Sequence, residues 1–131
     1  ACEEAQCRLI SYSPLCLGLL TGKYTLDKLP RNGNPRRQLF RELLAPGTGT
    51  QDLLNTIEAI ATEYGKTNSQ VAINWALCKG TVPIPGCRTL QQAEENIGAT
   101  GWRLKDDAVT ELEVKAAAVT KPMIQNIFQT R

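Results

Sequence analysis

The chain contains no histidine, which removes one of the two side chains that most often bind zinc in proteins. Its charges nearly cancel, with 15 Lys and Arg against 13 Asp and Glu, so no strongly basic balance suggests a nucleic-acid partner. No apolar run approaches the roughly 20 residues that a membrane-spanning helix needs. We therefore expect no zinc site, no nucleic-acid partner and no membrane association.

Cysteine is present, but not in a recognisable pattern. The five cysteines include no Cys-x-x-Cys pair: Cys2, Cys7, Cys16, Cys78 and Cys87. An odd number without such spacing favours reduced thiols over a disulfide framework. The sequence also begins without methionine, signal peptide or transit segment, and ACEEAQC is typical of the end of a helix. We therefore expect these 131 residues to belong to a longer protein.

The hydrophobic pattern predicts an alternation of strands and helices. Residues 8–13 suit a buried strand that Pro14 ends, and residues 81–84 suit a very short second strand. Helical spacing, with caps at Asn68 or Ser69 and at Thr89, predicts helices at residues 51–64, 69–79, 90–99 and 106–118. In the last of these, the residues expected to face inward are Val109, Leu112, Ala116 and Val119. This order indicates an α/β fold with parallel strands.

The connections are rich in glycine, proline and arginine. Residues 17–23 are expected to form a compact loop, and residues 25–49 a long connection with one helical piece at 38–44. The arginines at 31, 36, 37 and 41 are interpreted as a polar loop, and Gly47–Thr50 as a linker. Two strands cannot form a covered parallel sheet alone, which again predicts a missing N-terminal portion.

Two segments carry a family resemblance: ISYSPLCLGLLTGKY at residues 10–24 and PIPGCRTLQQAEENIGA at residues 83–99. Together they resemble the seventh and eighth strands, with their following loops, of the aldo-keto reductase (β/α)8 barrel. The resemblance implies that residues 1–131 are the C-terminal part of an NADP-dependent oxidoreductase domain, with about two of the eight TIM-barrel strands. Functional groups in such barrels lie at the carboxyl ends of the strands.

The first segment is implied to hold the nicotinamide and pyrophosphate of NADPH or NADP. Tyr12 would lay its ring against the nicotinamide. A belt over the pyrophosphate would follow, with Lys23 supplying charge and Gly18 permitting close approach. The members of this belt are Ser13, Leu15, Gly18, Thr21 and Lys23, and Pro14 within the same stretch is also implied to bind the cofactor. Cys16 and Leu17 depart from the small residues common at these positions. Without this context, Tyr12 would be read as a core aromatic residue.

The second segment is implied to hold the adenosine part of the cofactor. Gly86 lies in its loop, and Arg88 and Thr89 precede a helix. Charge, hydroxyl and helix N-terminus thus meet where a 2′-phosphate would bind. Adenine and ribose would be bound by three residues on one helix face: Gln92, Glu95 and Asn96. Taken alone, these side chains would be read as solvated surface groups.

No catalytic residue can be assigned in this chain. The family transfers hydride from nicotinamide to a carbonyl, with a Tyr as general acid assisted by Lys, Asp and His on earlier strands. This chain has no His, and its Tyr and Lys residues lie outside those motifs. We therefore expect the chain alone to be inactive.

A finer resemblance comes from GKTNSQVAINWALCKGTVPIPG at residues 65–86 and MIQNIFQTR at residues 123–131. These segments resemble plant chloroplast members of the family that reduce pyridoxal to pyridoxine. This implies a small carbonyl substrate and a chloroplast location for the full-length protein. Two alternatives stay open: an inactive truncated product, and a nucleotide-binding module like the channel-associated β subunits. The isolated chain is also expected to be helical yet loosely packed, or to associate with itself.

Overall fold

The computed structural model describes residues 4–121, so the terminal segment 123–131 lies outside the described residues. Eight elements follow one another along this part of the chain: β1 (Ile10–Tyr12), a 3-10 helix η1 (Cys16–Thr21), α1 (Arg36–Leu43), α2 (Thr50–Tyr64), α3 (Asn68–Cys78), β2 (Val82–Ile84), α4 (Leu90–Ile97) and α5 (Asp106–Ala117). The predicted order of strands and helices is therefore confirmed. No described helix is both long and apolar enough to span a membrane.

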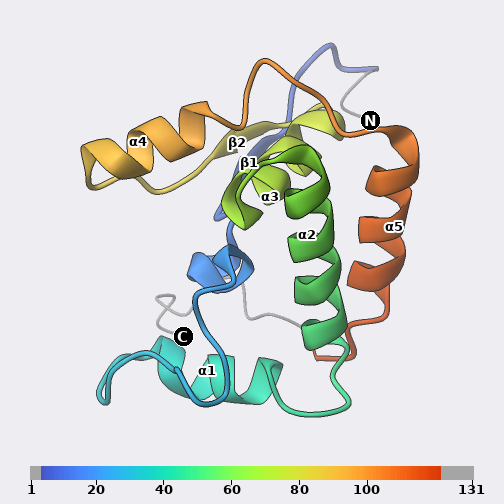
Figure 1. The fold of residues 1–131 in the computed structure, drawn as a ribbon. Coiled ribbons are helices and arrows are strands. Elements are labelled where there is room, and N and C mark those ends of the chain that lie inside the picture. The colour runs from blue at the N-terminus through green and yellow to red at the C-terminus, as the bar shows by residue number, and fades with distance from the viewer. Residues whose placement is uncertain (1–3, 122–131) are drawn as a thin grey trace.

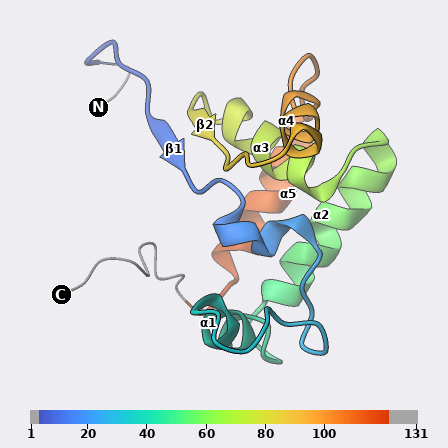
Figure 2. The same cartoon turned by 90° about the vertical axis from the view of Figure 1, so that its left-hand side faces the viewer.

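The two strands pair in parallel, as predicted. Ile10 pairs with Val82 and Tyr12 with Ile84, and Figure 2 shows the two strands side by side. The expected burial of the first strand is wrong, because Ile10 is 60% and Tyr12 54% exposed. Within residues 4–121 the sheet has two strands only, so one strand face and the outer edges lack the neighbours that would cover them.

The main core lies between α2, α3 and α5. Helices α2 and α5 run side by side (Figure 1), and α3 packs against α2. Aliphatic side chains fill the space between them: Ile57, Ile60, Ala61, Val71, Leu104, Ala108 and Leu112. The expectation that Ala116 faces this core is wrong, because Ala116 is exposed at the rim of a hollow beside η1. The buried residues of α5 are Ala108 and Leu112.

A second core joins η1 to α1 and α2. Its buried residues are Leu19, Leu39, Phe40, Leu43, Leu44 and Leu54. Two predictions about the connections are corrected here. Residues 17–23 are not simply a loop, since η1 covers Cys16–Thr21, and three of the four arginines at 31–41 lie on helix α1 rather than in a loop. The apolar residues of α1 bury one face of that helix, while its arginines occupy the others.

The turn before α2 is a packed junction rather than a linker. The Thr48 hydroxyl donates to the main-chain oxygens of Leu43 at 2.6 Å and Ala45 at 2.9 Å. Gly49 has a φ of +80°, and a Cβ there would lie 2.8 Å from the oxygen of Ala118. Only glycine fits both the left-handed backbone and this close approach.

The starts of α3 and α4 are defined by threonine caps. The cap of α3 is Thr67 rather than Asn68 or Ser69: its side chain accepts from the N–H of Gln70, and the Gln70 side chain accepts from the N–H of Thr67. This reciprocal capping box satisfies donors that the helix leaves unpaired. The predicted cap of α4 is confirmed, since Thr89 accepts from the N–H of Gln92 at 3.2 Å.

Candidate functional site

Both candidate segments leave the sheet at the same edge. Because β1 and β2 are parallel and Tyr12 pairs with Ile84, the chain following each strand emerges beside the other. One continuation enters η1, and the other reaches the N-terminus of α4, which projects away from the α2–α5 pair (Figure 1). The sheet thus brings together two segments that are far apart in sequence.

The continuation of β1 has an unusual backbone. Ser13, Cys16 and Leu17 have φ angles of 51°, 49° and 58°, although none of them is glycine, and Gly18 follows at 96°. Left-handed conformations at such residues are costly and concentrate at ligand-binding and active sites. Main-chain hydrogen bonds from Cys16 to Ser13 and from Gly18 to Leu15, both 2.9 Å, close these turns. The predicted belt is therefore a tightly wound segment.

Three side chains hold this segment in place. Leu19 is buried in the second core, and the Thr21 hydroxyl donates to the oxygen of Gly18 at 2.7 Å. Arg36 of α1 donates from Nη1 to the oxygen of Leu17 at 2.8 Å. The role of Arg36 was missed from the sequence, because its place in an arginine-rich stretch gave no sign of a contact with residue 17.

The other residues predicted in the first segment are accessible. Lys23 is exposed, with its Nζ 5.0 Å from the centre of the Tyr24 ring, and Tyr12 is more than half exposed. Ser13 is exposed, whereas Pro14 and Leu15 are partly buried. The geometry therefore presents a hydroxyl, an amine and an aromatic ring from one short stretch of chain.

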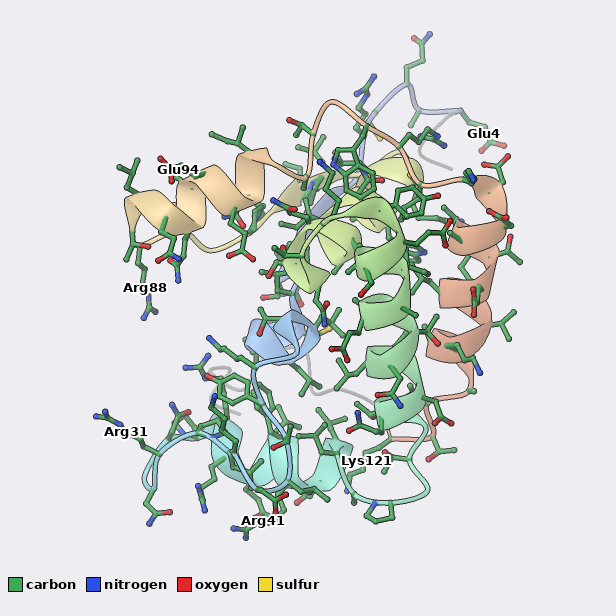
Figure 3. The ribbon with its side chains drawn as sticks, in the orientation of Figure 1. Glu4, Arg31, Arg41, Arg88, Glu94 and Lys121 are labelled. Carbon is green, nitrogen blue, oxygen red and sulfur yellow. The ribbon has the colours of Figure 1, made fainter. Side chains whose placement is uncertain are left out.

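The second segment forms the beginning of α4. Arg88 is exposed, and Figure 3 shows it at the free end of α4. The Arg88 main-chain N–H donates to Oε1 of Gln92 at 2.8 Å, and Asn96 donates to the oxygen of Gly86 at 3.4 Å. Two of the three side chains predicted to meet adenosine therefore shape the loop that carries Arg88. The helix N-terminus and the guanidinium together place positive charge at this end of α4.

Glu95 is connected to α3 rather than to its own loop. The Thr67 hydroxyl donates to Oε1 of Glu95 at 3.0 Å, and the Gln70 side chain donates to the main-chain oxygen of Glu95 at 3.1 Å. Neither connection was predicted from the sequence. The only signal was the Thr-x-x-Gln spacing of a capping box, which does not reveal a contact with another helix.

A hollow of about 390 Å³ lies behind the belt, between β1, η1, α2, α3 and α5. Its walls are mainly apolar and include Leu17, Leu53 and Trp75, and the indole N–H of Trp75 is buried without a partner in the described part of the chain. Cys16 also borders it, and burial raises the pKa of the Cys16 thiol. A thiol held in its protonated form is a poor nucleophile.

The sequence matches known proteins over most of its length. The model of the "Aldo/keto reductase family" matches residues 1–117. The chain is 54% identical over 130 residues to the chloroplastic pyridoxal reductase of Arabidopsis thaliana. This match covers 99% of the chain and 34% of the relative. It is 36% identical over 115 residues to the NADP(+) aldo-keto reductase yakc of Schizosaccharomyces pombe, covering 86% of this chain and 34% of the relative.

Solved structures confirm the predicted fold class. Glycerol dehydrogenase AKR11B4 from Gluconobacter oxydans superposes with a TM-score of 0.78 at 22% identity, covering 98% of this chain and 40% of that one. The aldo-keto reductase MGS-M4 from a deep-sea metagenome library superposes with a TM-score of 0.59 at 18% identity, covering 99% and 37%. The chain is thus part of an α/β barrel, and it spans about a third of the length of the curated relatives it matches.

Proposed function

The chain belongs to the aldo/keto reductase family, and from this premise we propose that it supplies the NADPH-binding loops of a carbonyl reductase. The observation that carries the proposal is the pairing of Tyr12 with Ile84, because the belt that follows β1 and the loop that leads from β2 to α4 then leave the sheet at the same edge. Binding sites of (β/α)8 barrels are built at this carboxyl edge.

The residues present suit a dinucleotide with a 2′-phosphate. Arg88 and the N-terminus of α4 provide positive charge for the phosphate, and an arginine can hold a phosphate with two parallel hydrogen bonds. Gly18, which has no Cβ and a φ of 96°, would permit close approach of the pyrophosphate to the backbone, and Lys23 adds an exposed cation. Gln92, followed three and four residues later by Glu95 and Asn96, lies on one face of α4, and these three side chains would complete the site toward adenosine.

The nicotinamide supplies a hydride to the substrate carbonyl when the cofactor is bound. Tyr12 would pack against the ring, and the belt would hold the pyrophosphate, which would keep the nicotinamide oriented toward the substrate. The general acid that protonates the resulting alkoxide lies on other strands of the complete barrel. This chain therefore binds and orients the cofactor and carries no catalytic residue.

Pyridoxal is the proposed substrate of the full-length protein. Its support is the 54% identity to a protein named chloroplastic pyridoxal reductase, which also supports a chloroplast location. The reaction would add a hydride from NADPH and a proton from the general acid to the aldehyde of pyridoxal, which gives the alcohol of pyridoxine and NADP(+).

The experiment is an assay of NADPH oxidation by the full-length protein with pyridoxal, beside the 131-residue chain at equal concentration. We expect turnover by the full-length protein and none by the chain alone. NADPH binding without turnover of any aldehyde would instead favour a nucleotide-binding module, and turnover by the chain alone would show that it holds its own general acid.

A further inference from the structure

The position of α4 depends on polar contacts, because none of its side chains is buried in the described part of the chain. Leu90 and Ile97 are 76% and 68% exposed. The contacts that join Glu95 to the first turn of α3 are the hydrogen bonds from Thr67 and Gln70. The α3 capping box therefore contacts both the backbone and the side chain of a residue in the proposed cofactor site.

The Thr67 hydroxyl has two partners of opposite kind. It accepts from the N–H of Gln70 at 3.2 Å and donates to Oε1 of Glu95 at 3.0 Å. A hydroxyl has a single proton to donate, and that proton is directed at the carboxylate once the helix N–H occupies a lone pair. Capping α3 and orienting Glu95 are therefore performed by one atom.

We propose that Thr67 is a positioning residue for adenosine recognition: it holds one oxygen of Glu95, so that the other oxygen accepts a hydrogen bond from an adenosine amine or hydroxyl. This inference rests on the proposed function. A long carboxylate side chain loses rotamer freedom when it binds a ligand, and a side chain that is already held loses less. The expected consequence is a higher affinity for the adenosine half of the cofactor.

The test separates helix capping from the contact with Glu95. In the full-length protein, Thr67→Asp keeps a strong N-cap acceptor but removes the donor and places a like charge beside Glu95. The matched variant Thr67→Ser keeps both functions. Each protein is titrated with NADPH and with reduced nicotinamide mononucleotide, which lacks adenosine, and thermal melting is measured in parallel.

We expect Thr67→Asp to weaken NADPH binding by up to about 10-fold, because Glu95 would then have to be immobilised by the ligand itself. Binding of the mononucleotide should be unchanged, and Thr67→Ser should bind both ligands like the wild type. A loss of affinity that is equal for the two ligands would show a general effect on folding and overturn the inference. Unchanged NADPH binding by Thr67→Asp would overturn it as well.

Glu95→Ala separates failure of this inference from failure of the proposed function. If Glu95→Ala leaves NADPH affinity unchanged, the adenosine site itself is misplaced. If Glu95→Ala weakens NADPH and Thr67→Asp does not, the site stands and the positioning role is wrong. In the double variant, Thr67→Asp should cause no further loss, because the carboxylate that Thr67 orients is absent.

Discussion

Arg36 donates a hydrogen bond from Nη1 to the main-chain oxygen of Leu17 at 2.8 Å, in the middle of the wound segment that follows β1. Leu17 has a left-handed φ of 58°, and the Arg36 side chain is itself held by Asn34, whose Oδ1 accepts from Nε at 3.4 Å. The contact therefore links helix α1 to a residue with a left-handed backbone inside the segment that carries the proposed belt.

Replacing Arg36 should loosen this belt. In the full-length protein, Arg36→Met keeps the apolar stem and removes the donors, and we expect NADPH to dissociate about 5- to 10-fold faster, as for loss of roughly one hydrogen bond from a charged donor. Stopped-flow fluorescence measures this rate. Arg41→Met is the control, since Arg41 lies exposed on the same helix, where its Nη1 donates to Oε1 of Gln38 at 3.5 Å. Equal rates for both variants would contradict the role of Arg36.

Gly98→Ala should disturb the contact between α3 and α4. A Cβ at Gly98 would lie 2.3 Å from Nε2 of Gln70, which donates to the oxygen of Glu95. The φ of Gly98 is −61°, so alanine suits the backbone and would otherwise stabilise the protein. We expect instead a loss of about 1 kcal/mol in the free energy of unfolding, measured with urea. The loss should vanish in a Gln70→Ala background, and its persistence there would assign it to another cause.

The described cysteines should differ in reactivity. Burial raises the pKa of Cys16, so less thiolate forms at a given pH, whereas Cys7 and Cys87 are exposed. Because the thiolate is the reactive form, we expect iodoacetamide to modify Cys7 and Cys87 before Cys16 in the folded protein. Mass spectrometry of timed samples measures the order. Early modification of Cys16 would show that the hollow beside it opens readily.

The isolated chain should associate with itself or melt without a sharp transition. Ile10, Tyr12 and Ile84 are more than half exposed, and within residues 4–121 the sheet has no strand beyond β1 and β2. Open sheet edges and exposed apolar surfaces promote association. Size-exclusion chromatography and calorimetry on the 131 residues measure this. A monodisperse monomer with a cooperative melt would show that they form a self-sufficient domain.

The sequence predicted those features that depend on local pattern. The apolar spacing of α2, the cap at Thr89 and the two short strands with their parallel pairing all agree with the structure. The placement of the thirteen predicted cofactor residues as a binding site stays a prediction, although their two segments leave the sheet at the same edge.

Features that depend on contacts between distant segments could not be predicted from the sequence. The cap of α3 was misplaced because threonine, asparagine and serine at 67–69 are all good N-caps, and only geometry selects Thr67. The contacts from Arg36 to Leu17 and from Thr67 to Glu95 are fixed by tertiary packing, which residue spacing does not encode. The prediction that β1 is buried was wrong. The apolar pattern of a strand indicates that its side chains are suited to burial, but it does not show whether the neighbours that would bury them are present.

Cofactor discrimination at Arg88 tests the central claim most directly. The full-length protein and its Arg88→Ala variant are titrated with NADPH and with NADH, which lacks the 2′-phosphate. A charge-assisted contact to phosphate contributes about 1.5–3 kcal/mol, so NADPH affinity should fall by roughly 10- to 100-fold while NADH affinity changes little. Equal losses for the two cofactors, or no loss for either, would contradict the placement of the 2′-phosphate at the N-terminus of α4.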